Sequence, residues 1–527
     1  MSRVLGFNGD YEGLSENEAW TRVYDVGKNL MPIRNSKIQK KYNNMFKKKT
    51  KVIRSGKVQT IKTDVIVPDD IILIEKGNFI PVDGIILEEK GLDLENDIML
   101  DTKLKEVDGK NYVADKPVYQ GMKVRAGRAL IEAKRTGATT FLGETIKEID
   151  VPDSKKGDIV RGYSLFNSIL SIVFFVLLTV ISLFKFGRVD IAIKTGIVGI
   201  IAIIPIAFVG VVLYRVINRN EGLKKSRLVI KNILTLFKIK KIDVICIDSK
   251  FLKKDYTSCI RNIYNIGTSI IVISENDLEE VELIANEAGI STKDTKSFSG
   301  NQIDNMSEEE LISAVCEGVI FYNISHSQKK KIIKAFKTGN ISVLSVGDGI
   351  EDLFAIAMSI IGISSNNVKG SIDNELADAY IYGNDFLSIY QLIKNKLALK
   401  REFINCFYFN TVFQIPLIVL TLFFSLWNVI FTSYLVQLII LALVVLPLML
   451  FLSIRKYNDE ELFSAEVFKF SFGKFLRSLL IGLGLGLIFI IEYLGLGVLI
   501  NSEVINITIL MFSIGLVDLL VVKLLKK

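Results

Sequence analysis

Long apolar runs divide this chain of 527 residues, and they constrain its fold more than any other feature. An α-helix rises about 1.5 Å per residue, so about 20 apolar residues span the ~30 Å hydrocarbon core of a bilayer. Two such runs come early and four come late: Tyr163–Phe184, Ile191–Val216, Phe403–Phe424, Val429–Leu452, Leu476–Ile500 and Ile505–Leu520. The sequence therefore predicts six transmembrane helices, as a two-helix hairpin over residues 160–217 and a four-helix membrane domain over residues 402–527.

The distribution of charge predicts how these helices are oriented. The chain has 65 basic and 57 acidic residues, a formal net charge of +8. The basic residues gather beside the apolar runs, at residues 154–161, 215–227, 394–401 and 523–527. Lys and Arg collect at the cytoplasmic ends of membrane helices, which explains the basic excess better than nucleic-acid binding does. We therefore expect a multi-pass plasma-membrane protein with both termini in the cytoplasm, with lipid and not nucleic acid as its partner.

Cysteine and histidine usage excludes two other classes of protein. The four cysteines, Cys246, Cys259, Cys316 and Cys406, show no paired spacing, and His326 is the only histidine. A disulfide framework or a zinc site is therefore not expected, and a reducing cytoplasm is the default compartment. The first twenty residues have no apolar core, so we expect no cleaved signal peptide.

The polar segments predict two domains of different kinds. Residues 1–47 contain a helical pattern over Ser15–Asn29. Residues 48–150 show short Val- and Ile-rich strands punctuated by Gly and Asp, which favours a compact β domain. Residues 220–400 alternate apolar strands with helical patterns, which predicts a doubly wound parallel sheet whose loops meet at the carboxyl ends of the strands. The fold class expected is a multidomain α/β plus β protein with a helical membrane domain.

Motifs in these two segments resemble the P-type cation-transport ATPases, also called E1-E2 ATPases. Residues 67–87 (VPDDIILIEKGNFIPVDGIIL) are similar to a signature of that family's actuator domain. Residues 226–250 resemble the stretch that ends in the phosphorylated DKTGT, and residues 346–364 (VGDGIEDLFAIAMSIIGIS) resemble the TGDGxND stretch. The resemblance spans most of residues 13–455 in the family's order. It implies an actuator-like β domain and a Rossmann-like phosphorylation domain of the haloacid-dehalogenase type.

The resemblance also implies positions for phosphoryl chemistry. Asp248 falls at the nucleophile that forms an aspartyl phosphate, and Ser274 falls at the Thr of the family's TGD motif. Lys329 falls at the lysine that neutralises phosphate charge, and Asp352 lies on the magnesium-binding loop. An Asp after a buried strand also commonly caps the next helix, so these residues have a purely structural interpretation as well.

The same comparison names a candidate magnesium site. Asp248 and Asp348 fall at the positions of the family's carboxylate ligands, and the backbone carbonyl of Lys250 is a further candidate ligand. Magnesium is thus a candidate cofactor. A Gly-Asp-Gly sequence such as residues 347–349 is also a common turn, and that structural alternative stays open.

Departures from the family pattern fall on the residues that handle ATP. DKTGT becomes residues 248–252 (DSKFL), and TGD becomes residues 274–276 (SEN). The nucleotide-binding domain is inserted after DKTGT in the family, yet only about two dozen residues separate Asp248 from Ser274, too few for a domain with its own core. Residues 94–103 (LENDIMLDTK) lack the glutamate of the family's TGES loop. No ATP site is recognisable.

The predicted membrane helices have also lost most cation ligands. Cation pumps present a Pro-Glu pair, an Asn and an Asp; this chain keeps Pro205 but has Ile206, Ala442 and Leu446 at the other positions. A dehydrated cation needs several oxygen ligands. The remaining candidates for a membrane site are Pro205, Asn405, Asn410, Gln414 and Gln437. Glu492 and Asp518 are candidate intramembrane acids, and the alternative that each lies at an interface or pairs with a neighbour is favoured. Glycines 482, 484 and 486 are best explained by close helix packing.

These observations predict a P-type ATPase homologue that is catalytically impaired. Fold-defining residues persist and ATP-specific residues are lost, so we expect a regulatory or scaffold subunit that binds a partner membrane protein or a second copy of itself. Two alternatives stay open. One is a magnesium-dependent phosphotransferase or phosphatase that uses Asp248, and the other is a transporter of an unusual solute.

Overall fold

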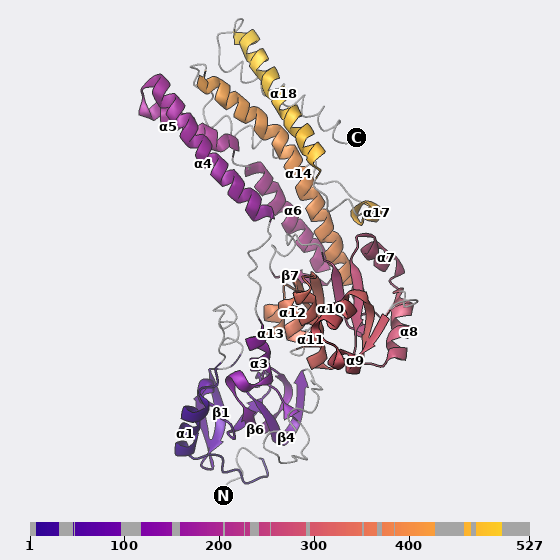
Figure 1. Cartoon of the computed structure of the whole chain (residues 1–527). Helices are drawn as coiled ribbons and strands as arrows, with labels where there is room; N and C mark the ends of the chain where they lie inside the picture. Colours follow the sequence, from indigo (N-terminus) through magenta and orange to yellow (C-terminus); the bar gives the residue numbers. More distant parts are fainter. Residues whose placement is uncertain are drawn as a thin grey trace. The chain divides into compact units, whose positions relative to one another are not determined.

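The chain is described by a computed structural model that forms two compact units (Figure 1). The first unit comprises Met1–Ser154, Lys224–Thr235 and Lys240–Tyr390, and the second comprises Lys155–Leu223, Leu236–Ile239 and Gln391–Lys527. The structure describes residues 7–30, 46, 48–95, 117–149, 159–203, 206–225, 227–231, 242–252, 255–290, 296–349, 352–365, 372–383, 385–426, 458–464 and 471–497.

The first unit begins with helix α1 (Glu16–Val26), within the predicted helical segment. Ser15 caps it: the Ser15 hydroxyl accepts the backbone N–H of Glu18, and the Glu18 carboxylate accepts the backbone N–H of Ser15. The helix ends at Gly27, whose φ of +89° is a backbone conformation that residues other than glycine rarely adopt. Local capping therefore makes α1 shorter than the predicted range Ser15–Asn29.

The β domain is a six-stranded antiparallel sheet in the order β2-β1-β3-β6-β4-β5. Its elements are β1 (Lys49–Arg54), β2 (Lys57–Lys62), η2 (Thr63–Val65), β3 (Ile71–Glu75), β4 (Asp83–Glu95), β5 (Pro117–Val118), β6 (Lys123–Arg135), η4 (Gly137–Thr139) and α3 (Phe141–Glu148). Alternate side chains of a strand point to opposite faces. Accordingly Ile72 and Ile74 of β3 join one hydrophobic cluster, and Ile71 and Leu73 join another. Both faces of the central strands are therefore covered.

A buried ion pair joins strand β1 to the turn before β3. The guanidinium of Arg54 donates two hydrogen bonds to the carboxylate of Asp70, from Nε at 2.8 Å and from Nη2 at 2.7 Å. The side chains are 5% and 0% exposed. The Asp70 carboxylate also accepts the backbone N–H of Val67 at 3.0 Å. Removing one partner would leave an uncompensated buried charge, and this makes the pair a sensitive test of the β domain.

We predict that Arg54→Ala destabilises the β domain by about 3–5 kcal/mol, the usual cost of breaking a buried ion pair. Hydrogen–deuterium exchange of the full-length protein, followed by mass spectrometry, should show faster exchange in β3 and β6. Lys51→Ala is the matched control, because Lys51 pairs with Glu75 at 3.4 Å on the exposed surface. That change should cost less than about 1 kcal/mol. Equal effects of the two changes would contradict the expected role of Arg54.

The α/β domain is an eight-stranded sheet in the order β10-β11-β9-β8-β12-β13-β14-β7. Its strands are β7 (Leu228–Ile230), β8 (Val244–Ile247), β9 (Ser269–Ile273), β10 (Lys296–Ser299), β11 (Gly318–Tyr322), β12 (Val343–Gly347), β13 (Ile361–Ser364) and β14 (Ala379–Ile381). The pairs from β10 to β14 are parallel, as the sequence predicts, and β7 adds an antiparallel edge to β14. Four apolar runs in the sequence predict strands, and they correspond to β8, β9, β11 and β12: VICID (residues 244–248), SIIVIS (269–274), VIFYN (319–323) and ISVLSVGDG (341–349).

Helices alternate with these strands, and the first connection is the important one. The helices are α7 (Thr257–Asn265), α8 (Leu278–Ala288), α9 (Gly300–Asn305), α10 (Glu308–Glu317), α11 (His326–Thr338), α12 (Leu353–Met358) and α13 (Ile372–Leu376). Between β8 and β9 the described residues form only the 3₁₀ turn η6 (Ser249–Phe251) and the nine-residue helix α7. No further folded element lies between these two strands in the described stretch 242–252 and 255–273.

The second unit is helical (Figure 1). Its helices are α4 (Ile159–Phe186), α5 (Val189–Ile203), α6 (Ile206–Lys225), α17 (Asp459–Leu462) and α18 (Phe472–Gly497), together with most of α14 (Phe386–Leu426). The predicted span Ile191–Val216 is divided between α5 and α6. In the sequence Pro205 stands at this division, and proline has no backbone N–H to continue a helix.

Two helices among the described residues are long and apolar enough to cross a membrane, over Asn167–Phe186 and Phe386–Phe423. The predicted spans Val429–Leu452 and Ile505–Leu520 lie outside the described residues. The total of six membrane helices therefore stays a prediction.

Specific contacts join the helices of the second unit. The carboxylate of Glu402, in α14, accepts hydrogen bonds from Nε of Arg215 at 3.1 Å and from Nε of Arg219 at 3.4 Å, both in α6. Helix α18 packs on α14 through glycines: a Cβ on Gly482 would lie 2.9 Å from Cβ of Ile415. Gly486 makes a similar approach to α14, whereas Gly484 faces open space. Close helix packing is thus confirmed for two of the three glycines.

Candidate functional site

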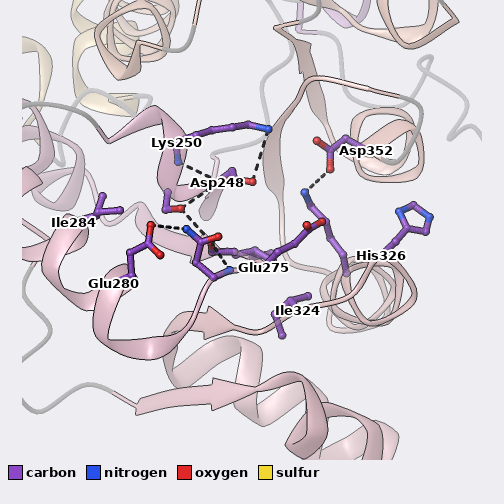
Figure 2. Close-up of a pocket in the computed structure, with 13 residues that line it drawn as sticks. Asp248, Lys250, Glu275, Glu280, Ile284, Ile324, His326 and Asp352 are labelled. Atoms are coloured by element: carbon purple, nitrogen blue, oxygen red, sulfur yellow. Dashed lines mark hydrogen bonds and ion pairs between the residues drawn. The ribbon is translucent and has the colours of Figure 1, made fainter. Parts of the chain in front are cut away.

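The order of the strands places the candidate residues at one edge of the sheet. Strand β8 lies between β9 and β12, and all three run parallel. Asp248, Ser274 and Asp348 each follow directly after one of these strands. In open α/β sheets, ligands bind in the crevice outside the carboxyl ends of the strands, where the strand order reverses. The structure has a pocket of about 350 Å³ there (Figure 2).

All four candidate catalytic residues line this pocket: Asp248, Ser274, Lys329 and Asp352. Asp248 is also the N-cap of η6. Its Oδ1 accepts the backbone N–H of Lys250 at 3.1 Å and the hydroxyl of Ser249 at 3.3 Å. The Asp248 side chain remains 22% exposed. Its carboxylate therefore caps η6 and is also partly accessible from the pocket.

Lys329 and Asp352 form an ion pair in the pocket that Asp248 also lines. Lys329 lies in the first turn of α11, and Asp352 is the buried N-cap residue of α12. Burial by itself would raise the pKa of the Asp352 carboxyl, but the Lys329 ammonium lowers the pKa below its usual value. The second carboxylate oxygen accepts the backbone N–H of Asp348 at 3.1 Å. The Asp352 carboxylate is thus ionised, and both of its oxygens have partners, Lys329 and the backbone N–H of Asp348.

The side chain of Lys250 lies between the two candidate magnesium ligands. Its Nζ is 2.7 Å from Oδ2 of Asp348 and 3.8 Å from Oδ2 of Asp248. Burial lowers the pKa of Lys250, but the carboxylates of Asp248 and Asp348 outweigh that effect and raise the pKa overall. Lys250 is therefore positively charged at neutral pH. From the sequence, only its backbone carbonyl was expected to act here.

The loop after β9 contributes polar groups that are already paired with one another. The buried hydroxyl of Ser274 lies 3.0 Å from the hydroxyl of Ser249 and accepts the backbone N–H of Asn276 at 3.3 Å. The next residue, Glu275, adds a carboxylate to the pocket. Desolvation raises the pKa of Glu275, and the nearby charge of Asp248 raises it further, although Lys329 opposes this. An anion entering the pocket would meet this carboxylate.

The pocket residues as arranged do not fit a magnesium ion. Mg²⁺ requires near-octahedral oxygen ligands at 2.0–2.1 Å. Here the Lys250 ammonium contacts one carboxylate oxygen of each candidate ligand, Oδ2 of Asp348 at 2.7 Å and Oδ2 of Asp248 at 3.8 Å. Among the described residues, no group of three or more His, Cys, Asp or Glu side chains is placed to hold a metal ion. The expected magnesium site is therefore not preformed.

The other candidates lie partly outside the described residues. Pro205, Gln437, Asp518 and residues 96–103 of the TGES-like stretch are among those not described. In the second unit Asn410 is buried in α14, and Gln414 donates from Nε2 to the carbonyl of Ile203, the last residue of α5. That carbonyl is thus bonded within the protein.

Comparisons with known proteins agree with the geometry of the β domain. The family model of the P-type ATPase actuator domain matches residues 44–150. Over these residues the chain is similar to the P-type ATPases. The predicted actuator domain is therefore confirmed, and the six-stranded antiparallel sheet is its structure in this protein.

Individual P-type ATPases match this chain over a limited part of their own length. The human calcium-transporting ATPase type 2C member 1 is 31% identical over 128 residues, which are 24% of this chain and 14% of the human protein. The Bacillus subtilis calcium-transporting ATPase is 25% identical over 142 residues, which are 27% of this chain and 16% of that protein. The chain thus matches about one seventh of the length of these relatives.

We predict that Gly347→Ala disrupts the pocket of this protein. A Cβ on Gly347 would lie 2.1 Å from Cβ of Asp352, so Asp352 would have to move away from Lys329. Overpacking of this kind costs about 1–3 kcal/mol or more. Thermal unfolding of the purified protein should show a lower midpoint. Gly222→Ala is the control, because a Cβ there meets no atom within 4 Å; that change should leave the midpoint unchanged or slightly higher.

We also predict that His326 makes the fold sensitive to acid. Burial, together with the ammonium of Lys330, lowers the pKa of His326 to about 4, from an ordinary 6.5. Both ring nitrogens are buried without a hydrogen-bond partner among the described residues. Below pH 6.5 the imidazole of His326 binds a proton in the unfolded chain but stays neutral in the folded protein. The free energy of unfolding therefore decreases as the pH falls from 6.5 toward 4.

Between pH 7.5 and pH 5.5 the wild-type protein should therefore lose roughly 1 kcal/mol more stability than His326→Leu. Chemical denaturation at the two pH values measures this difference. His326 is the only histidine in the chain, so no other imidazole contributes. The same pH dependence in both proteins would contradict a buried, neutral imidazole.

Proposed function

We propose that this P-type ATPase relative is a membrane-embedded pseudo-ATPase that acts as a regulatory or scaffold subunit and does not run an ATP-driven phosphorylation cycle. The observation that carries the proposal is the connection between β8 and β9. Its described part holds η6 and α7 and nothing larger. In the family the nucleotide-binding domain is inserted at this place, so the route by which ATP would reach Asp248 is missing.

The loop that follows Asp248 also favours loss of phosphorylation. In the family a Thr-Gly-Thr segment wraps the acyl phosphate, and glycine allows the backbone to approach closely. Here Phe251 stands at the glycine position and is fully buried, and Leu252 beside it is 3% exposed. These side chains anchor the loop in the core of the domain. The loop therefore lacks the freedom to close around a phosphoryl group.

The helical unit supports a location in a membrane. Helix α4 exposes large apolar side chains over most of its length, among them Ile169, Ile172 and Val176, which are 52–64% exposed. Exposed apolar surface of this extent marks a surface that is covered by lipid or protein. We propose six membrane helices in the plasma membrane, with both termini in the cytoplasm. The partner would be another membrane protein or a second copy of this chain.

A second candidate function is a magnesium-dependent phosphotransferase or phosphatase that forms an aspartyl phosphate at Asp248. The observation in its favour is that Asp248, Lys329 and Asp352 line one pocket. The paired hydroxyls of Ser249 and Ser274, and the carboxylate of Glu275, weigh against phosphate binding. Transport of an unusual solute is a weaker alternative, because Gln414 already occupies the carbonyl of Ile203.

Phosphoenzyme formation tests the proposal. Full-length protein in detergent is incubated with radiolabelled ATP, acetyl phosphate or inorganic phosphate, each with Mg²⁺ and with EDTA, beside Asp248→Asn and an active P-type ATPase. We expect no acid-stable label on this protein under any condition and strong label on the active pump. Label that is absent from Asp248→Asn would show that the phosphorylation step survives, and it would favour the phosphotransferase.

A further inference from the structure

We infer that the ammonium group of Lys250 takes the place of a divalent cation at the carboxyl edge of β8 and β12. The inference deepens the proposed function, and rests on it, because it says how the site remains folded without the ion that phosphoryl transfer requires. The interaction between Lys250 and the two carboxylates can be tested by metal binding, without an assay of enzymatic activity.

The first support is electrostatic. Asp248 and Asp348 come from the ends of neighbouring parallel strands, so the topology brings two carboxylates together. Two carboxylates at neighbouring strand ends repel each other, and a cation that contacts both of them offsets this repulsion. Lys250 provides that cation, 2.7 Å from Asp348 and 3.8 Å from Asp248. The positive charge of Lys250 thus partly neutralises the negative charge of Asp248 and Asp348.

The second support is the way in which Lys250 is held. Its backbone N–H donates to Oδ1 of Asp248 at 3.1 Å, which fixes the start of the side chain. Its Nζ also lies 5.9 Å from the ring centroid of Phe251, within the range of a cation–π contact. Phe251 is fully buried and cannot move aside. Within the segment 248–251, Asp248 therefore supplies a carboxylate, Lys250 supplies the ammonium group, and the ring of Phe251 packs beside that ammonium group.

The third support is that the Lys250 ammonium excludes a divalent cation from the two carboxylates. A divalent cation bound to both carboxylates would lie within contact distance of the Lys250 ammonium, and two cations so close repel strongly at low dielectric. Divalent binding therefore requires Lys250 to leave. The carboxylates themselves remain suitable for a metal, because Oδ1 of Asp348 is buried without a hydrogen-bond partner among the described residues. Removing the ammonium should consequently open a divalent site in an otherwise unchanged pocket.

Manganese binding tests the inference, with Mn²⁺ as a paramagnetic substitute for Mg²⁺. Electron paramagnetic resonance of the full-length protein in detergent measures the Mn²⁺ that is bound. We expect Lys250→Met, which keeps the length and removes the charge, to bind one Mn²⁺ about tenfold or more tightly than the wild type does. The gain should be competed by Mg²⁺ and lost in Lys250→Met/Asp348→Asn. Lys250→Arg, which keeps the charge, should show no gain.

Two results would overturn the inference. One is a Mn²⁺ site in the wild-type protein that disappears in Asp348→Asn, because it would mean that the ammonium does not exclude the metal. The other is a folded Lys250→Met, verified by circular dichroism, that gains no site. If Lys250→Met does not fold, the wild-type comparison decides alone, together with the thermal midpoint of the wild type, which Mg²⁺ should not raise.

The phosphorylation experiment separates this inference from the proposed function. Label at Asp248 that forms in EDTA would overturn the pseudo-ATPase and support an internal cation. Label that requires Mg²⁺ would overturn both. A Mn²⁺ site in the wild-type protein without any label would overturn the internal cation alone.

Discussion

The parallel order β9-β8-β12 is the constraint on which the candidate site depends. Parallel strands end at the same edge of a sheet, so residues that are far apart in the sequence meet there whatever their chemistry. Asp248 and Asp348 are one hundred positions apart by number, yet they share one ammonium partner. The sheet thus creates a concentration of negative charge, and every other feature of the pocket concerns how that charge is balanced.

The balance is achieved by the protein itself. Each of the two pocket lysines is paired with carboxylates: Lys250 with Asp248 and Asp348, and Lys329 with Asp352. The hydroxyls of Ser249 and Ser274 contact each other. A phosphoryl-transfer site keeps such groups available for the substrate and for its metal ion. In this protein these groups pair with one another, and this pairing supports the proposed loss of phosphoryl transfer.

The same principle recurs in the helical unit. The Gln414 amide donates to the carbonyl of Ile203 at the end of α5, and Glu402 in α14 accepts from Arg215 and Arg219 in α6. In a low-dielectric environment an unpaired polar group is costly, so backbone carbonyls at an interrupted helix need partners. Bound ions supply such partners in transporters, whereas an internal side chain does so at Ile203. In both units, charged and polar groups thus pair with other groups of the protein.

The sequence by itself determined the apolar runs and the strands β8, β9, β11 and β12, because periodicity and run length are properties of neighbouring residues. Resemblance to a family placed the actuator-like domain at residues 48–150, and the family model matches residues 44–150. The same resemblance placed Asp248, Ser274, Lys329 and Asp352 at one site. The sequence did not predict the antiparallel edge strand β7, since that strand forms only by pairing with the distant strand β14.

Only the tertiary structure decided what the site residues do. Lys250 has a flexible side chain whose direction depends on two carboxylates, one of them on a strand formed about a hundred residues later. The Ser249–Ser274 contact spans 25 positions, and the Gln414–Ile203 contact spans 211. No local pattern records such pairings, because their energy arises only when folding brings the groups together and removes the water that would otherwise solvate them.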